Sequence, residues 1–340
     1  MNKKPKHAQI DEIQGTGKPV SKSYLEYGDE LDGTRNAEVR DLRVFRPKVV
    51  VIVGPTASGK TSLSIQIAKE FNGEIVSADS RQVYKGLDIG SGKVTEEEMD
   101  GVPHHLLDVA DPNDVYTVAN YIEDGRKAIA DILERGKLPI VVGGTFFYTD
   151  ALLGRISTPK VPPNPALRAR LEKLDTELLF KKLKDVDSRR AQTVDSQNRV
   201  RLIRALEVID ALGIVPEQTS EELYDVLTIG ISVEKTILHK NIHNRLVSRL
   251  DDGMIEEVEV LQQEGLSWDR LEALGLEYRY IAQFLQEKIP KGEMFGLIES
   301  ESRKFAKRQM TWLKRDKSIR WFKKDDIKKI EQTILTFLSS

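Results

Sequence analysis

Hydrophobic stretches of two kinds alternate through the first half of the chain. Short runs rich in valine and isoleucine at residues 49–53, 74–77 and 138–142 have the length of buried strands. Between them, residues 62–71 and 116–135 repeat their apolar positions every three or four residues, which indicates helices that pack one face against a sheet. Alternating strands and helices are typical of an α/β fold with a doubly wound parallel sheet, and we predict this fold class.

The pattern changes at the proline-rich segment 158–165. Beyond it the apolar spacing is only helical, until residues 224–231 again have the pattern of a strand of the parent sheet. We predict an all-helical insertion domain at residues 157–212, carried by a core of residues 47–156 and 213–340. The helices expected inside the insertion lie at residues 167–174, 178–183 and 200–211.

The last third of the chain is predicted to be a helical C-terminal region. Its apolar positions recur at nearly every fourth residue from Leu246 to Leu261, and this helical pattern stops at Gly265. Residues 1–46 are polar, and we expect them to form a flexible N-terminal extension. Residues 87–93 are rich in glycine and are expected to form a mobile loop.

Composition excludes several classes of protein. Of the 340 residues, 39% are hydrophobic and 31% charged, which is typical of a soluble globular protein. No apolar run approaches the roughly 18 residues that a membrane span needs. The chain has no cysteine, which excludes disulfides, thiolate zinc sites and cysteine nucleophiles and favours a cytoplasmic location. The adjacent His104 and His105 lack an evident third ligand, and we reject a metal site there.

Positive charge is concentrated near the C-terminal end. Residues 302–329 contain twelve Lys and Arg against three Asp, a local charge of +9 in a chain whose net charge is −2. A basic segment on an otherwise acidic protein suggests a polyanionic partner, whereas a solvated helix face is the common alternative. Helical spacing puts one set of polar residues on a shared face, namely Lys304, Lys307, Arg308, Thr311, Lys314 and Arg315.

A glycine-rich turn joins the first predicted strand to its helix. It follows the pattern G-x-x-x-x-G-K-T of the P-loop, whose backbone N–H groups and helix N-terminus surround a phosphate. Lys60 would add a cation, and the Thr61 hydroxyl could ligate Mg²⁺. The predicted phosphate-binding residues are Gly54, Pro55, Thr56, Ala57, Ser58, Gly59, Lys60 and Thr61.

Two further polar residues should reach the same edge of the sheet. Asp79 follows the strand at 74–77, and Thr145 follows two glycines after the strand at 138–142. In an α/β sheet, ligands bind at the carboxyl ends of the strands. P-loop enzymes that cleave ATP usually have a second acidic residue there, which this chain lacks. One carboxylate and one hydroxyl also fit a reaction in which diphosphate leaves and the carboxylate accepts a proton.

Seven sequence blocks occur in the order found in tRNA dimethylallyltransferases, the isopentenyl transferases of tRNA. The resemblance runs from about Pro47 to Trp321, and although no single block is unique to the family, the seven in order are specific for it. The blocks are residues 54–61, 77–84 (SADSRQVY), 88–90, 101–106 (GVPHHL), 143–145, 201–208 (RLIRALEV) and 307–313 (KRQMTWL).

The resemblance implies an alkyl transfer from dimethylallyl diphosphate to N6 of the adenosine 3′-adjacent to the anticodon, with Mg²⁺ and diphosphate held by the P-loop. Asp79 would be the general base, Thr145 would contact the adenine, and Arg279 would reach the diphosphate or nearby RNA. The adenine must be flipped out of the anticodon loop. The implied contacts with the tRNA anticodon stem-loop are Asp79, Ser80, Arg81, Gln82, Arg168, Val200, Arg201, Leu202, Ile203, Arg204, Lys307, Arg308, Gln309, Met310, Thr311, Trp312, Leu313 and Lys314.

The chain departs from the family in two ways. Glu277 replaces the first residue of the family's Gly-Tyr-Arg, and without cysteine the zinc finger of the eukaryotic members is excluded, so the bacterial type matches better. Three alternatives remain: an adenylate isopentenyltransferase, a P-loop small-molecule kinase, and a nucleotide-dependent RNA-binding module. The basic helix and the insertion favour tRNA over a free nucleotide as acceptor. We expect a monomer, because no dimerisation heptad is evident.

Overall fold

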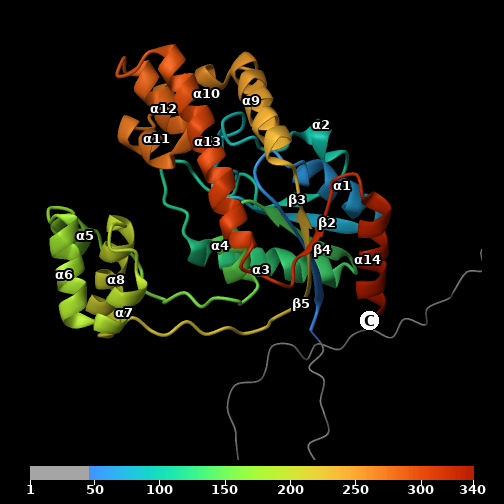
Figure 1. Cartoon of the computed structure of the whole chain (residues 1–340), viewed down its shortest axis with the longest axis horizontal. Coiled ribbons are helices and arrows are strands. Elements are labelled where there is room, and N and C mark those ends of the chain that lie inside the picture. The colour runs from blue at the N-terminus through green and yellow to red at the C-terminus, as the bar shows by residue number, and fades with distance from the viewer. Residues whose placement is uncertain (1–45) are drawn as a thin grey trace, which may run out of the picture. The chain divides into compact units, whose positions relative to one another are not determined.

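A computed structural model describes residues 46–340 of the chain (Figure 1). Within this range six parallel strands form one sheet, in the order β3-β2-β4-β1-β5-β6. The predicted doubly wound α/β fold is confirmed, while the extension predicted at 1–46 lies, except for its last residue, outside the described range. The strands are β1 (Lys48–Val53), β2 (Gly73–Ala78), β3 (His104–His105), β4 (Leu138–Gly143), β5 (Asp225–Ile231) and β6 (Arg320–Phe322).

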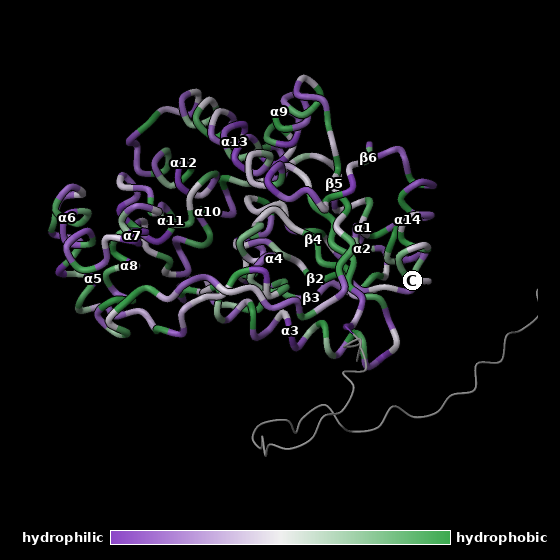
Figure 2. The backbone as a smooth tube through the Cα atoms, turned by 60° about the horizontal axis from the view of Figure 1, so that its bottom comes forward, coloured by the Kyte–Doolittle hydropathy of each residue, from purple (hydrophilic) through white to green (hydrophobic). Residues whose placement is uncertain are grey.

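Both faces of the sheet are covered by helices because successive side chains of a strand point to opposite faces. On one face Val49 and Val51 of β1 pack with α3 and α4, whereas Val50 and Ile52 pack on the other face with α1 and α14. Figure 2 shows hydrophobic residues along the central strands β4 and β5. The helices of these layers are α1 (Lys60–Glu70), α3 (Val118–Glu134), α4 (Phe146–Leu152) and α14 (Ile327–Ser339); the short α2 (Glu96–Met99) precedes β3.

The segment predicted as an insertion contains four helices within the described chain. They bury their own apolar cluster, which includes Leu179, Leu183 and Leu202, each with less than 1% of its surface exposed. The domain boundaries at residues 157 and 212 remain a prediction. The helices are α5 (Pro165–Leu171), α6 (Thr176–Val186), α7 (Ser188–Thr193) and α8 (Arg199–Leu212).

A third apolar cluster lies in the C-terminal helical region. Its helices pack Met254, Val258 and Ile281 against Val83 and Leu87, which follow β2. The helical repeat that begins at Leu246 is divided in two, because Gly253 adopts the left-handed φ of 95° between α9 and α10. The helices are α9 (Lys235–Asp251), α10 (Met254–Gln263), α11 (Trp268–Leu274), α12 (Leu276–Leu285) and α13 (Lys291–Leu313).

The short edge strand β6 was not predicted from the sequence, since three residues with an exposed arginine and tryptophan carry no strand signal. It pairs with β5 from Ile229 to Ile231, and Gly230 leaves the space that the Trp321 ring fills. The carboxyl end of β6 therefore reaches the same edge of the sheet as the P-loop. Among residues 46–340, no helix combines the length and the apolar character needed to cross a membrane.

Candidate active site

The P-loop connects β1 to the first turn of α1. Ala57 and Gly59 have left-handed φ angles of 60° and 85°, which curl the loop so that successive N–H groups converge. The N–H groups of Gly59, Lys60 and Thr61 have no acceptor among the described residues. Because an α-helix leaves its first N–H groups unpaired and its N-terminus carries positive character, this loop can bind an anion.

Lys60 has a low pKa for a lysine. Its Nζ donates to the Pro55 carbonyl at 2.9 Å inside the loop. Burial, with a smaller effect from the Arg245 guanidinium, lowers the pKa of Lys60 to about 7, and the Asp79 carboxylate only partly opposes this shift. An anion in the loop would restore the cationic form.

Two side chains of α9, one helical turn apart, hold the outer side of the P-loop. Arg245 Nη2 donates to Thr56 Oγ1 at 2.5 Å, and Asn241 Nδ2 donates to the Ala57 carbonyl at 3.1 Å. Surrounding protein and the nearby Arg249 lower the pKa of Arg245 to about 10, so this guanidinium stays charged at neutral pH. Arg245 therefore brings a second cation to the loop.

Gln309 of α13 joins the P-loop to the end of β4. Its Oε1 accepts from the Thr56 N–H at 2.8 Å, and its Nε2 donates to the Gly144 carbonyl at 3.0 Å. The residue is 4% exposed. A buried amide with both ends paired fixes the distance between the two loops, which is a structural role.

Asp79 and Thr145 meet at the carboxyl ends of the neighbouring strands β2 and β4. Thr145 Oγ1 accepts from the Ser80 N–H at 3.1 Å, while Asp79 Oδ1 accepts from the N–H groups of Arg81 at 2.8 Å and Gln82 at 3.4 Å. The carboxylate thus orders its own turn, as an aspartate after a strand often does. Its second oxygen makes no hydrogen bond to the described protein and is free for a reaction partner.

One cavity unites the phosphate loop with this turn. Lys60 and Thr61 line it together with Asp79 and Gln82, and so do Gly143 and Gly144 at the end of β4. The Thr61 hydroxyl and the Asp79 carboxylate are hard oxygen donors of the kind that Mg²⁺ prefers. No cluster of three or more His, Cys, Asp or Glu suited to a metal occurs in residues 46–340, so an ion here would need oxygens from a substrate.

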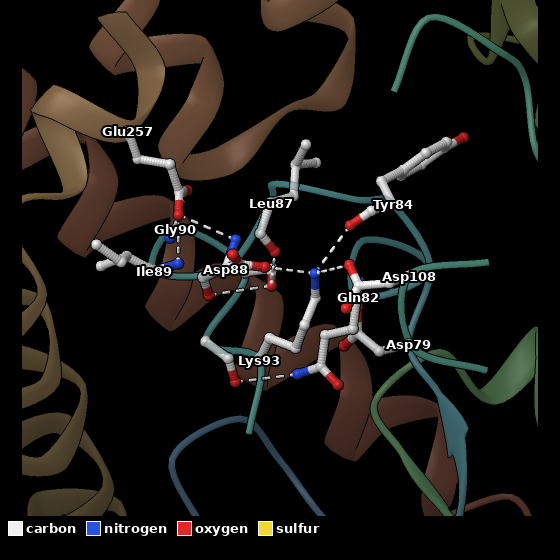
Figure 3. Close-up of polar contacts among 12 residues, drawn as sticks. Asp79, Gln82, Tyr84, Leu87, Asp88, Ile89, Gly90, Lys93, Asp108 and Glu257 are labelled. Atoms are coloured by element: carbon white, nitrogen blue, oxygen red, sulfur yellow. Dashed lines mark hydrogen bonds and ion pairs between the residues drawn. The ribbon is translucent and has the colours of Figure 1, made fainter. Parts of the chain in front are cut away.

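The loop at residues 87–93, expected to be mobile, is tied down on both sides (Figure 3). Glu257 of α10 accepts from the N–H groups of Asp88, Ile89 and Gly90 at 2.5–3.0 Å. Lys93 bonds to Asp88 and Asp108, and Gln82 Nε2 donates to the Gly92 carbonyl at 3.0 Å. These bonds hold the loop beside the cavity, which Ser91 and Gly92 line, and so they do not favour the mobility expected from the sequence.

Arg279 does not line the cavities at the P-loop. Its Nε donates to the Glu272 carbonyl at 3.0 Å, and its guanidinium lies near that of Arg81 beside Gly275. The described cations at the loop are instead Lys60, Arg245 and Lys324, so the structure does not support Arg279 as a diphosphate ligand.

The residues of the insertion predicted to contact RNA fall into two groups. Arg168 forms a bidentate pair with the buried Glu207 at 2.8 Å, and Arg204 also bonds to Glu207, which holds the pKa of Glu207 at about 2. Leu202 and Ile203 are buried in the insertion cluster. These residues stabilise the insertion, whereas Val200 and Arg201 are exposed.

The RNA contacts predicted at residues 307–314 also divide into buried and exposed residues. Gln309 and Leu313 are buried, and Met310 packs against the sheet cluster, so direct RNA contact does not fit them. Lys307, Arg308, Thr311 and Lys314 are exposed, and Trp312 is half-buried. A shallow groove is lined by Lys304, Lys307, Arg308, Thr311, Trp312 and Arg315.

Sequence reasoning missed Asn241, Arg245, Glu257 and Lys324. The only available signal was that Asn241 and Arg245 are four residues apart and so share a helix face. Nothing in the local sequence shows that this face covers a loop almost 190 residues away.

Comparison with known sequences identifies the family. Residues 82–316 match the family model described as IPP transferase, and residues 47–112 match the one described as isopentenyl transferase. The tRNA dimethylallyltransferase of Bacillus mycoides is 39% identical over 301 residues, covering 86% of this chain and 94% of that protein. The Bacillus cereus enzyme of the same name is equally similar.

Solved structures agree in fold. The tRNA isopentenylpyrophosphate transferase of Bacillus halodurans superposes with a TM-score of 0.67 at 33% identity, covering 87% of this chain and 97% of that one. A eukaryotic dimethylallyltransferase acting on tRNA superposes with a TM-score of 0.69 at 27% identity, covering 83% of this chain and 75% of that one. The chain therefore belongs to the IPP transferase family, together with the tRNA dimethylallyltransferases.

Proposed function

We propose that the protein transfers the dimethylallyl group of dimethylallyl diphosphate to N6 of the adenosine 3′-adjacent to the anticodon in tRNA. The observation that carries this proposal is the single cavity lined by the P-loop residues Lys60 and Thr61 and by Asp79. A diphosphate in the loop and a nucleophile beside the carboxylate can thus face one another. Family membership supports the same chemistry.

In the proposed reaction, the adenine N6 forms a bond to C1 of the dimethylallyl group as the C1–O bond breaks. The electron pair of that bond leaves with the diphosphate, whose charge Lys60, Arg245 and the α1 N-terminus stabilise. Asp79 accepts the proton released from N6. Thr145, held beside the Ser80 N–H, would orient the adenine.

Enzymes of this family need a divalent metal ion, and we propose that it is Mg²⁺ here. The Thr61 hydroxyl would hold the ion together with diphosphate oxygens. When bound, it would neutralise charge that builds up on the leaving group. The exposed residues of α13 and of the start of α8 would bind the phosphates of the anticodon stem-loop.

A transfer assay tests the proposal against its alternatives. The purified protein is incubated with radiolabelled dimethylallyl diphosphate, Mg²⁺ and either unmodified tRNA or AMP, and in parallel with ATP and small-molecule acceptors. We expect label in tRNA at the adenosine next to the anticodon and none in AMP. Label only in AMP would indicate a free-nucleotide prenyltransferase, and ATP turnover without prenyl transfer would indicate a kinase.

A further inference from the structure

A second cavity opens on the outer side of the P-loop. It is lined by loop residues 57–61, by Asn241, Asn244 and Arg245 of α9, and by Lys324. Three of these side chains are cations, counting Lys60, and none is a carboxylate. Like charges gathered without a counterion favour an anionic ligand.

Lys324 lies directly over the loop. A methyl group added at Gly59 would sit 2.8 Å from Lys324 Cδ and 3.2 Å from its Nζ. The aliphatic part of the lysine therefore occupies the space that the missing side chain of Gly59 leaves, and the ammonium reaches the mouth of the phosphate site.

The backbone that carries Lys324 is fixed relative to the P-loop. Phe322, two residues earlier, is paired with Ile231 in the sheet, and its carbonyl accepts from the Ser232 N–H at 2.8 Å and the Ser232 hydroxyl at 3.0 Å. The Ile231 carbonyl in turn lies 3.1 Å from the position of a methyl group added at Gly54, where the P-loop begins. The pairing of β6 with β5 thus determines the position of the Lys324 backbone relative to the P-loop.

Lys324 has no acidic partner within residues 46–340, whereas the nearby Lys329 pairs with Asp326 at 3.0 Å.

We propose that Lys324 binds the outer phosphate of the prenyl diphosphate, from the solvent side of the P-loop. The inference rests on the proposed function and adds a residue to its diphosphate site. Lys324 lies beyond residue 316, where the match to the family model ends. The cation that closes the site in this chain thus comes from the turn between β6 and α14.

Two variants test this assignment, with inorganic diphosphate as the probe in titration calorimetry. Lys324→Ala should weaken diphosphate binding about tenfold and raise the KM for dimethylallyl diphosphate to a similar degree, with a smaller effect at high salt. Lys323→Ala removes the same charge from an exposed neighbour that does not line the cavity, and it should change binding less than about twofold. Thermal midpoints should match, because Lys324 is exposed.

Equal affinities of wild type and Lys324→Ala for diphosphate would overturn the inference. So would weaker tRNA binding with unchanged diphosphate binding, since the lysine would then contact RNA. The calorimetric measurement does not depend on prenyl transfer. If wild-type protein binds diphosphate through Lys324 but fails to modify tRNA, the proposed function fails while this assignment stands.

Discussion

Asp79 combines a structural and a chemical role in one carboxylate. One oxygen orders the turn at Arg81 and Gln82, and the other is free to accept a proton. Asn keeps the accepting oxygen but cannot act as a base. We therefore expect Asp79→Asn to lower turnover by about 10²- to 10⁴-fold while tRNA affinity changes little. Single-turnover kinetics and filter binding measure the two effects, and full activity of the variant would exclude Asp79 as the base.

Lys60 makes diphosphate binding dependent on pH. Burial and Arg245 lower its pKa to about 7, so a large share of the protein has a neutral lysine at pH 8. A bound diphosphate raises this pKa again, so binding takes up a proton, and affinity falls as pH rises above about 7. Calorimetry at pH 8 in buffers of different ionisation enthalpy measures the uptake. Lys60→Arg keeps the charge permanently and should show less uptake; equal uptake in both proteins would contradict the assignment.

Residues of the site differ in how far the sequence predicts them. The P-loop, Asp79 and Thr145 are local features, because each comes shortly after a strand with a clear apolar pattern. Arg245, Asn241 and Glu257 reach the site only through packing of the C-terminal helices, which no local pattern encodes. The resemblance to the family supplied residue roles, but it also suggested RNA contacts at Gln309 and Leu313, which the fold buries.

At the scale of elements, the cavity wall depends on an ion pair between α9 and α12. Arg249 Nη1 lies 3.3 Å from Glu277 Oε1 and 3.3 Å from the Gly90 carbonyl, and both side chains are nearly buried. Glu277 is the residue that replaces the glycine usual in the family. A methyl group added at Gly92 would collide with the Arg249 guanidinium. The departure at position 277 therefore has a structural explanation: it balances the charge of a buried arginine.

Removing either partner of this pair leaves an uncompensated buried charge, so the losses of the two single variants should not add up in the double variant. We expect Glu277→Gln to lower the free energy of unfolding by about 2–3 kcal/mol, and the double variant with Arg249→Met to lose at least about 1 kcal/mol less than the sum of the single variants. Urea denaturation of the four proteins gives the coupling. Additive effects would mean that the two charges do not interact.

Helices and strands could be predicted from the sequence where burial of a face leaves a periodic pattern of apolar residues. The strands β1, β2, β4 and β5 and the helices α1, α3, α5, α6 and α8 lie where predicted, since they bury apolar residues on one or both faces. The edge strands β3 and β6 and the division at Gly253 were missed, because a two- or three-residue edge strand is defined by its partner and a helix break by one backbone angle.

At the scale of the whole molecule, we expect the uneven distribution of charge along the chain to control tRNA binding. The +9 segment at residues 302–329 presents Lys307 and Arg308 of α13 and Lys314 at its C-terminal cap as exposed cations. If they contact phosphates, each releases counterions, and the slope of log affinity against log salt reports how many contacts form.

The triple variant Lys307→Ala, Arg308→Ala and Lys314→Ala should thus weaken tRNA binding and flatten its salt dependence by about two units of slope. The control removes the same charge outside this segment, by replacing the exposed Arg126, Lys127 and Lys235 with Ala. If overall charge alone attracted the RNA, both variants would weaken binding equally. A loss confined to the α13 variant, with diphosphate affinity unchanged, would assign the basic face to RNA, whereas wild-type affinity at low salt would make it a solvated helix surface.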